Sequence, residues 1–392
     1  MAILFTPAVL ATQPVQAQTY TVLYSFTKAN GPSAAGLIGD ATGNLYGTSQ
    51  GGSHTHGMVF KLDPSGAESR FHHFKGAPVD GSTPLAALVQ DAQGNFYGTT
   101  GNGGSACAPY GCGTVFKIDT RRRETVLYSF TGTGGDGFYP TADLALDKAG
   151  NLYGTTAGGG NDTCLGSCGT VFKLDHEGNE TVLYRFTGTG GDGYGPYAGL
   201  VQDGRGNLYG TTMFGGDLTC TSPGCGTVFK LDKNLKETVL YIFNGNAGDG
   251  YYPSGLIRDR RGNLYGTTRG GGLYNHGIVF KLDTTGQETV LYSFTGTGGD
   301  GATPSSDLVR DQQGNLYGTT FFGGDLTCFE VGYGCGTVFE LDKNGMETVL
   351  HAFNGTDGAN PLGTLLLGDQ GNLYGTTSSG LYSWGNVFKI TP

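Results

Sequence analysis

The sequence predicts an all-β fold, a seven-bladed β-propeller with four antiparallel strands per blade. A Gly-Asn-Leu/Phe-Tyr-Gly-Thr string recurs seven times, at intervals of 51 to 57 residues. The segments between the copies are short, rich in Val, Leu, Thr, Tyr and Phe, and bounded by Gly, Asp or Asn, as strands are. No segment has a sustained 3.6-residue period, so almost no helix is expected. Regular units of four short strands are typical of propellers. The copies begin at Gly43, Gly94, Gly150, Gly206, Gly262, Gly314 and Gly371.

Each repeat contains four strand-like segments, which we name a to d in chain order. In the fourth repeat they read GLVQD (199–203), NLYGTT (207–212), GTVFKL (226–231) and ETVLYIF (237–243). The first repeat is preceded by a lone d segment, residues 20–26, and the chain ends after a lone c segment, residues 386–390. We expect the first segment to complete the last blade. Such a closure leaves the ring without an unpaired sheet edge.

Composition narrows the classes of protein that fit. The 392 residues include 74 Gly without a three-residue period, and the net charge is −10, which disfavours nucleic acid as a partner. No later segment approaches the roughly 20 apolar residues that span a membrane. The apolar run Ala2–Ala11 at the start is followed by Val15-Gln16-Ala17, which fits signal cleavage, so residues 1–17 are expected to be a signal peptide. It lacks a basic N-terminal region, which a truncated start would explain; a disordered tail is the alternative. We expect one propeller domain over residues 18–392.

The repeated polar residues are interpreted as structural. An Asp precedes each x-x-Gly-Asn between segments a and b, where an Asx side chain can bind the backbone ahead of it and Gly can take positive φ. The Tyr of each Gly-Asn-Leu-Tyr is expected to pack between blades. The Asp residues of this series are Asp40, Asp91, Asp147, Asp203, Asp259, Asp311 and Asp369.

One face of the predicted ring carries all the irregular sequence. Because strands alternate in direction, the long b–c and d–a loops share a face, which we call the loop face, and the short a–b and c–d turns share the other, the turn face. Loops on a rigid scaffold often carry function. Aromatic side chains among polar loop residues suit sugar stacking or a protein hot spot, although they could instead cover the core. The candidate ligand-binding residues are Tyr139, Tyr194, Tyr197, Phe214, Tyr251, Tyr252, Phe321, Phe322 and Trp384.

Metal binding is weakly indicated at two places. An Asp-Gly recurs in the d–a loops, and a ring of such oxygens could bind Ca²⁺. A tight turn that requires Asp before Gly is the favoured alternative, so no cofactor is expected. His54 and His56 could ligate a metal, but two histidines alone are weak support. The candidate calcium ligands are Asp136, Asp192, Asp249 and Asp300.

The eight cysteines lie in four b–c loops, two in each, and the other three blades have none. A zinc site needs four ligands, which would have to come from different blades, and the spacings are not the C-x-x-C of redox sites. One disulfide per loop fits best, as in exported proteins. The predicted pairs are Cys107–Cys112, Cys164–Cys168, Cys220–Cys225 and Cys328–Cys335.

The repeat GNLYGTT…GTVFKL…ETVLYSFTG…GDG resembles the bacterial GloVer tandem repeat over residues 20–390. The resemblance implies a secreted or surface-displayed propeller and brings no catalytic residues. This chain stops at Pro392, after segment c, which favours a freely secreted or periplasmic protein over an anchored one. We expect a monomer that is secreted, periplasmic or on the cell surface.

Three functions remain open. The first is a non-catalytic scaffold that binds an extracellular glycan or protein through the loop face. The second is a polysaccharide hydrolase or lyase, which would need positioned carboxylates. The third is a structural surface or matrix component. The irregular acids available to an enzyme on the loop face are Asp162, Asp217, Asp325 and Glu330.

Overall fold

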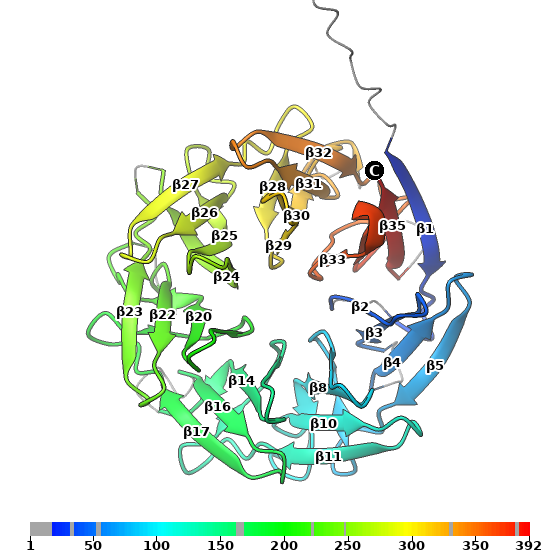
Figure 1. The fold of residues 1–392 in the computed structure, drawn as a ribbon, viewed down its shortest axis with the longest axis vertical. Helices are drawn as coiled ribbons and strands as arrows, with labels where there is room; N and C mark the ends of the chain where they lie inside the picture. The colour runs from blue at the N-terminus through cyan, green and yellow to red at the C-terminus, as the bar shows by residue number, and fades with distance from the viewer. Residues whose placement is uncertain are drawn as a thin grey trace, which may run out of the picture.

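The computed structural model is a closed seven-bladed β-propeller around a central channel (Figure 1). The structure describes residues 18–31, 35–51, 56–161, 168–220, 223–246, 248–328, 332–380 and 384–392. The predicted signal peptide, residues 1–17, lies outside this part. Apart from a short 3₁₀ turn at Asp369–Gly371, the described residues form strands, turns and loops. None of their helical segments is long and apolar enough to cross a membrane.

Six blades are four-stranded antiparallel sheets, and blade 6 has a fifth short strand; in each blade the innermost strand a lines the channel. Blade 1 comprises β2 (Ile38–Gly39), β3 (Leu45–Ser49), β4 (Met58–Leu62) and β5 (Glu68–His73). Blade 2 comprises β7 (Val89–Gln90), β8 (Phe96–Thr100), β10 (Thr114–Ile118) and β11 (Glu124–Ser129). Blade 3 comprises β13 (Ala145–Leu146), β14 (Leu152–Thr156), β16 (Thr170–Leu174) and β17 (Glu180–Arg185). Blade 4 comprises β19 (Val201–Gln202), β20 (Leu208–Thr212), β22 (Thr227–Leu231) and β23 (Glu237–Ile242).

The remaining blades follow the same order. Blade 5 comprises β24 (Gly250–Arg258), β25 (Leu264–Gly271), β26 (Ile278–Leu282) and β27 (Glu288–Ser293). Blade 6 comprises β28 (Gly301–Pro304), β29 (Val309–Arg310), β30 (Leu316–Gly323), β31 (Thr337–Leu341) and β32 (Glu347–Ala352). Blade 7 comprises β33 (Leu366–Leu367), β34 (Leu373–Thr376), β35 (Asn386–Thr391) and the first strand of the chain, β1 (Thr19–Ser25).

The ring closes as the sequence predicts. Strand β1 pairs antiparallel with β35, with Thr19 opposite Thr391 and Ser25 opposite Asn386. The Tyr20 hydroxyl also donates a hydrogen bond to the Asp357 carbonyl, 2.7 Å away, so the N-terminal strand is joined to the loop that follows blade 6. Both ends of the described chain therefore contribute to one blade.

A ring of phenylalanine pairs joins the blades. The Phe that follows strand d of one blade meets the central Phe of strand c in the next blade, edge to face, at centroid distances of 5.0 to 5.4 Å. Edge-to-face pairs add about 1 kcal/mol beyond area burial. The pairs are Phe26–Phe60, Phe74–Phe116, Phe130–Phe172, Phe186–Phe229, Phe243–Phe280, Phe294–Phe339 and Phe353–Phe388.

The a–b turns have the predicted Asx geometry. In blade 5, Asp259 Oδ1 accepts hydrogen bonds from the Arg261 and Asn263 backbone N–H groups, each at 2.9 Å. Its Oδ2 accepts from the Asn263 amide at 2.8 Å and the Tyr265 hydroxyl at 3.2 Å. Partial burial raises the pKa of Asp259, but these hydrogen bonds outweigh it and lower that pKa below its ordinary value. The repeated Tyr thus stabilises the turn in addition to packing between blades.

Short ladders join the d–a and b–c loops, which the sequence analysis treated as loops alone. They are β6 (Gly81–Ser82) with β9 (Asn102–Gly103), β12 (Gly137–Phe138) with β15 (Gly158–Gly159), and β18 (Gly193–Tyr194) with β21 (Phe214–Gly215). Glycine permits this approach: a Cβ at Gly103, where φ is +89°, would lie 2.5 Å from the Asp80 carbonyl oxygen. The loop face is therefore more ordered than its irregular sequence suggests.

Candidate functional site

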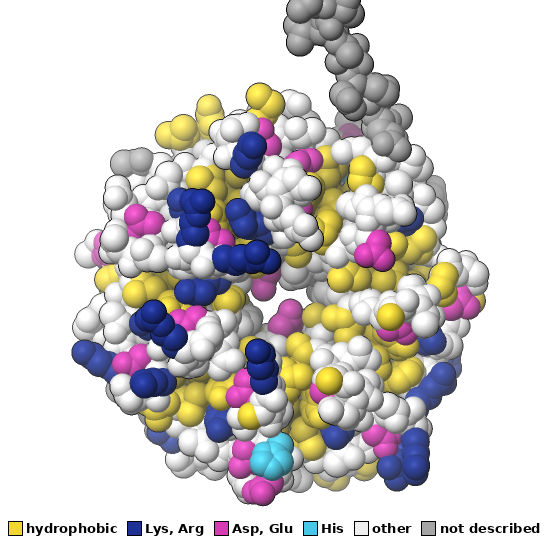
Figure 2. Space-filling model, in the orientation of Figure 1, with side chains coloured by type: hydrophobic (Ala, Val, Ile, Leu, Met, Phe, Trp, Pro, Cys, Tyr) yellow, Lys and Arg dark blue, Asp and Glu magenta, His cyan; other side chains and the backbone are white. Residues whose placement is uncertain are grey.

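Two aspartates interrupt the innermost ring of small residues. In every blade, one residue at the inner edge directly precedes a buried Leu, either in strand a or in the segment that leads into it. This position is equivalent in all seven repeats. In five blades it is Gly, Ala or Thr, but in blades 3 and 6 it is Asp143 and Asp307. A pocket of about 90 Å³ in the channel is lined by both aspartates together with Tyr197 and Ser305. Figure 2 shows acidic side chains beside the central opening. The equivalent residues are Gly36, Ala87, Asp143, Gly199, Gly255, Asp307 and Thr364.

Each of these carboxylates reaches back to the preceding blade. Asp143 Oδ1 accepts a hydrogen bond from the Ala87 N–H at 2.6 Å, and Asp307 accepts one from the Gly255 N–H. Burial and the neighbouring charge of Asp143 raise the pKa of Asp307 to about 7, although the Gly255 hydrogen bond opposes the shift. Burial also raises the pKa of Asp143. The pair can therefore hold one proton near neutral pH, which suits donation or acceptance of a proton or hydrogen bond.

An aromatic cluster on the loop face contains most of the predicted ligand-binding residues. The Phe214 ring contacts Tyr194 at a centroid distance of 5.4 Å, Tyr197 at 6.3 Å and Tyr252 at 5.4 Å. Tyr251 meets Tyr252 at 4.9 Å. Tyr197 is 44% exposed, whereas the other four are half-buried. The structure therefore brings five of the nine predicted residues together, and Tyr197 is the most exposed of the five.

Tyr197 links this cluster to the channel. It lies in the segment that leads into strand a of blade 4, four residues before β19, and lines the same pocket as Asp143 and Asp307. Burial raises the pKa of its phenol, the Tyr139 phenol adds to the shift, and the Arg269 guanidinium opposes it. Tyr139 and Arg269 therefore each lie near Tyr197, although three blades supply these residues. Arg269, which the sequence analysis did not select, is exposed on β25.

The other predicted aromatic residues lie elsewhere. Phe321 and Phe322 pack against each other in blade 6 at 4.7 Å, and Phe322 meets Tyr333 at 5.6 Å. Trp384 is 46% exposed, and its backbone N–H donates to the Phe26 carbonyl at the closing seam. The ring contacts of Phe321 and Phe322 are thus with each other and with Tyr333. The loop face thus carries separate aromatic groups.

Two residues at the mouth have left-handed backbone. Tyr139 and Tyr252 both precede Pro and have φ of +60° and +58°. Such conformations cost about 1–2 kcal/mol for an L-residue and persist where the surroundings hold them. Here the Tyr139 N–H donates to Cys112 O and the Tyr252 N–H to Cys225 O, each at 2.9 Å. Each strained residue is thus held by the backbone carbonyl of the second cysteine in a disulfide-bridged loop.

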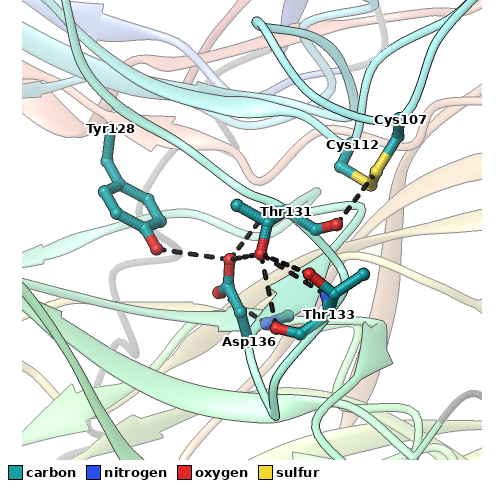
Figure 3. The surroundings of a disulfide bond; sticks show 7 residues. Cys107, Cys112, Tyr128, Thr131, Thr133 and Asp136 are labelled. Atoms are coloured by element: carbon teal, nitrogen blue, oxygen red, sulfur yellow. Dashed lines mark hydrogen bonds between the residues drawn. A yellow bond between two sulfur atoms is a disulfide. The ribbon is translucent and has the colours of Figure 1, made fainter.

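The disulfides lie against the d–a loops. Cys107–Cys112, Cys220–Cys225 and Cys328–Cys335 are disulfides, at the spacings predicted, with Cα–Cα distances of 5.4 to 5.9 Å. Cys168 is buried, and its predicted partner Cys164 lies outside the described residues. In blade 2, Cys107 Sγ lies 3.2 Å from Thr131 O, and Thr131 donates to Asp136 from both its backbone and its hydroxyl (Figure 3). The bridge thus packs on the loop that leads to the channel.

Histidine takes the place of the second cysteine in two cysteine-free blades. His56 and His276 accept hydrogen bonds on their carbonyls from Thr83 and Thr303, as Cys112 and Cys225 do from their tyrosines. The His56 ring also fills the space over Gly76. His56 thus has a structural role in blade 1. His54, its predicted partner, lies outside the described residues.

The predicted calcium ligands belong to four separate d–a loops. Asp136 Oδ2 accepts from the Thr131 N–H at 2.7 Å and the Thr131 hydroxyl at 2.8 Å, and its Oδ1 accepts from the Gly137 N–H at 2.6 Å. Asp192 and Asp300 bind their loops through Oδ2 in the same way, as Asp249 does through the Asn244 N–H. These bonds are those of the tight turn that the sequence analysis favoured.

One cluster of metal-ligating type occurs in the described residues. His72 Nε2 and carboxylate oxygens of Asp80 and Glu124 lie within 4.8 Å of one another, between blades 1 and 2. At the junction between blades 2 and 3, Tyr128 occupies the position equivalent to His72, and its hydroxyl donates a hydrogen bond to Asp136. A divalent cation could bind to the His72 group.

Of the four acids proposed for an enzyme, the two that the structure describes bind within their own loops. Asp217 and Asp325 each bind the Thr two residues ahead, Thr219 and Thr327, within their own loops. Asp162 and Glu330 lie outside the described residues. The sequence analysis missed Asp143 and Asp307 instead. An alignment of the seven a segments would have found them, because each stands where the other repeats have Gly, Ala or Thr.

The fold is shared with solved propellers of very different sequence. Virginiamycin B lyase from Staphylococcus aureus superposes with a TM-score of 0.62 at 11% identity, over 96% of this chain and 99% of that chain. The extracellular domain of a protein described as a one-component system from B. thetaiotaomicron superposes with a TM-score of 0.57 at 11% identity, over 95% of this chain and 40% of that chain. No curated protein matches this chain in sequence.

The repeat itself has a family. The Gloeobacter/Verrucomicrobia repeat model matches residues 8–223 and 220–392, and so covers nearly the whole chain in two copies. This match includes every Gly-Asn-Leu/Phe-Tyr string and the closing strands. The chain therefore belongs to the Gloeobacter/Verrucomicrobia repeat family.

Proposed function

We propose that this protein is an extracellular binding scaffold that engages a glycan on its loop face, at the mouth of the channel. The observation that carries the proposal is the exposed ring of Tyr197, packed edge-on against Phe214 and adjoining the pocket of Asp143 and Asp307. A sugar ring stacks on an aromatic face through its C–H groups, and its hydroxyls need hydrogen-bond acceptors. Tyr197 and the two carboxylates offer both.

Export of the chain is part of this proposal. Three disulfides in short loops suit an oxidising compartment, where such bonds persist. The extracellular domain with the same fold gives a precedent for a propeller outside the cell. Holding the b–c loops in one shape would reduce the ordering cost when a ligand binds.

A glycan array with the purified chain tests the proposal. The strongest hit is then titrated against Tyr197→Ala and against Tyr110→Ala, a matched control on the same face that is 77% exposed. We expect Tyr197→Ala to weaken binding by about tenfold or more, because a buried aromatic contact is worth over 1 kcal/mol, while Tyr110→Ala changes it little. Equal affinities for the two variants would contradict the proposed site. A specific protein caught in pull-downs, with an empty array, would favour a protein ligand instead.

The channel aspartates favour hydrolysis or lysis of a polysaccharide as a second candidate function. Two carboxyls, one of which has a pKa of about 7, are what general acid–base chemistry requires. Turnover of an array hit that disappears in Asp307→Asn, while binding persists, would support an enzyme. Asp217→Asn, which alters an acid confined to its own loop, serves as the control.

A further inference from the structure

The turn face of blades 4 to 6 holds a concentration of unpaired cations. Figure 2 shows Lys and Arg side chains gathered on one side of the viewed face. Two neighbouring grooves, of about 730 and 750 Å³, both contain Arg258, Arg260 and Arg261. We call this surface the arginine grooves, defined by Arg205, Arg258, Arg260, Arg261, Lys281 and Arg310. It lies on the face opposite the site proposed above.

The fold does not require these arginines. The a–b turn reads Gly-Asp-Ala-Thr in blade 1 and Gln-Asp-Ala-Gln in blade 2, but Arg-Asp-Arg-Arg at 258–261 in blade 5. All three turns place the same Asp–backbone hydrogen bonds. The positions that flank the Asp can therefore vary, and in blade 5 all three are Arg. The chain has a net charge of −10, and the same turn forms without arginine. The fold therefore does not explain this local excess of positive charge.

The nearby acids leave these cations without ion-pair partners, although Arg258 and Arg310 each lie over a tyrosine ring. Asp203 and Asp259 use both carboxylate oxygens to bind their own turns. Within the described residues, Arg123–Asp119 is the one ion pair of a Lys or Arg side chain, so no arginine of the grooves is paired within 4.0 Å. The Nε of Arg258 is moreover buried and has no hydrogen-bond partner. A buried donor without a partner is costly, so the fold leaves this guanidinium incompletely satisfied.

We propose that the arginine grooves bind a carboxylate-bearing polysaccharide. The guanidinium fork matches a planar carboxylate through two parallel hydrogen bonds. Two adjoining grooves that share three arginines suit an extended chain with charges along its length. Nucleic acid fits less well: the faces of Tyr209 and Tyr265 are covered by Arg258 and Arg310, at 5.6 and 5.7 Å, so they offer no free ring for stacking a base. The overall negative charge also disfavours a densely charged phosphate polymer.

Polygalacturonate is the probe that tests this proposal, with neutral dextran, poly(dT) and phosphatidylglycerol vesicles as comparisons. One variant changes Arg258, Arg260 and Arg261 to Gln. Its matched control changes Arg121, Arg122 and Arg123, the run on the c–d turn of blade 2, to Gln and removes the same charge. We expect the first variant to weaken polygalacturonate binding by about tenfold or more, since several charge-assisted bonds are lost, and the control to weaken it less than about twofold.

Three results would overturn the proposal. These are a failure of polygalacturonate to bind the unmodified protein, equal losses in the two triple variants, and tighter binding of poly(dT) or of the vesicles than of polygalacturonate. Unchanged melting temperatures show that both variants fold. Arg258→Lys, which keeps the charge but not the fork, should lose most of the affinity that Arg258→Gln loses. Because Tyr197→Ala should leave this binding unchanged, failure here is distinguishable from failure at the loop face.

Discussion

Asp307 of blade 6 accepts a hydrogen bond from the backbone N–H of Gly255, which occupies the equivalent inner position of blade 5. Asp143 has the same relationship to Ala87, at 2.6 Å. A side chain on Gly255 would collide with the Asp307 carboxylate, so Gly at this position leaves room for the acid. Two equivalent acids in different blades thus use the same interblade contact, and both face the channel.

The two channel carboxyls should titrate as a coupled pair. The charge of Asp143 raises the pKa of Asp307, so Asp143→Asn should lower that pKa from about 7 toward its ordinary range. Burial remains, so some elevation should persist. Carbon-13 NMR of the aspartate carboxyls during a pH titration measures this shift. Asp217→Asn is the control, and an Asp307 pKa that Asp143→Asn leaves unchanged would show that the two groups do not interact.

The junctions between blades should make stability depend on pH. Burial first, and then the charge of an Asp in the preceding loop, raises the pKa of Glu180, Glu237, Glu288 and Glu347 from 4.5 to about 7. Between these values the folded protein holds more protons than the unfolded chain. The contribution of these groups to stability is therefore full below about pH 4.5 and is lost as pH rises through about 7.

Urea unfolding measures this dependence. We expect the free energy of unfolding to fall between about pH 5 and pH 8, and a variant with all four residues changed to Gln to show a flatter profile. Glu177→Gln, in an exposed turn, is the matched control. A four-residue variant with the slope of the unmodified protein would rule out these junction carboxyls as its source.

The loop disulfides should matter more for loop order than for global stability. A bridge that closes so few residues is worth roughly 2 kcal/mol by chain entropy. Changing Cys220 and Cys225 to Ser should lower the free energy of unfolding by about that amount. Hydrogen exchange should rise in residues 214–220 and 244–252, because Cys225 O holds the Tyr252 N–H. Faster exchange spread over all blades, rather than confined to these loops, would mean that the bridge supports the whole fold.

Much of the architecture could be predicted because the same sequence pattern occurs seven times. The strands, the Asx turns, the closing strand and the cysteine pairs each follow from a local pattern. The interblade contact of Phe353 with Phe388 could not be assigned, since it joins residues of two repeats and depends on how the blades tilt. The short ladders such as β12–β15 were missed for a similar reason: their strands are two residues long and rich in Gly, which carries no strand signal.

The candidate site was predicted only in outline. The loop face and the aromatic residues around Phe214 were selected, but their grouping depends on contacts between loops of different blades. Asp143 and Asp307 were overlooked because a single Asp in a short inner strand resembles the many turn aspartates nearby. Arg269 directly follows the NLYGTT pattern of segment b, and a single Arg at that position carries no signal of function. Their common position near the channel becomes visible only when the blades are arranged in a ring.

The most direct test of the loop-face site is a crystal structure of the protein with the strongest glycan from the array. We predict a sugar ring stacked on Tyr197, with hydroxyl groups within hydrogen-bonding distance of Asp143 or Asp307. A neutral glycan bound on the turn face, or at the edge of the ring away from Tyr197, would contradict it.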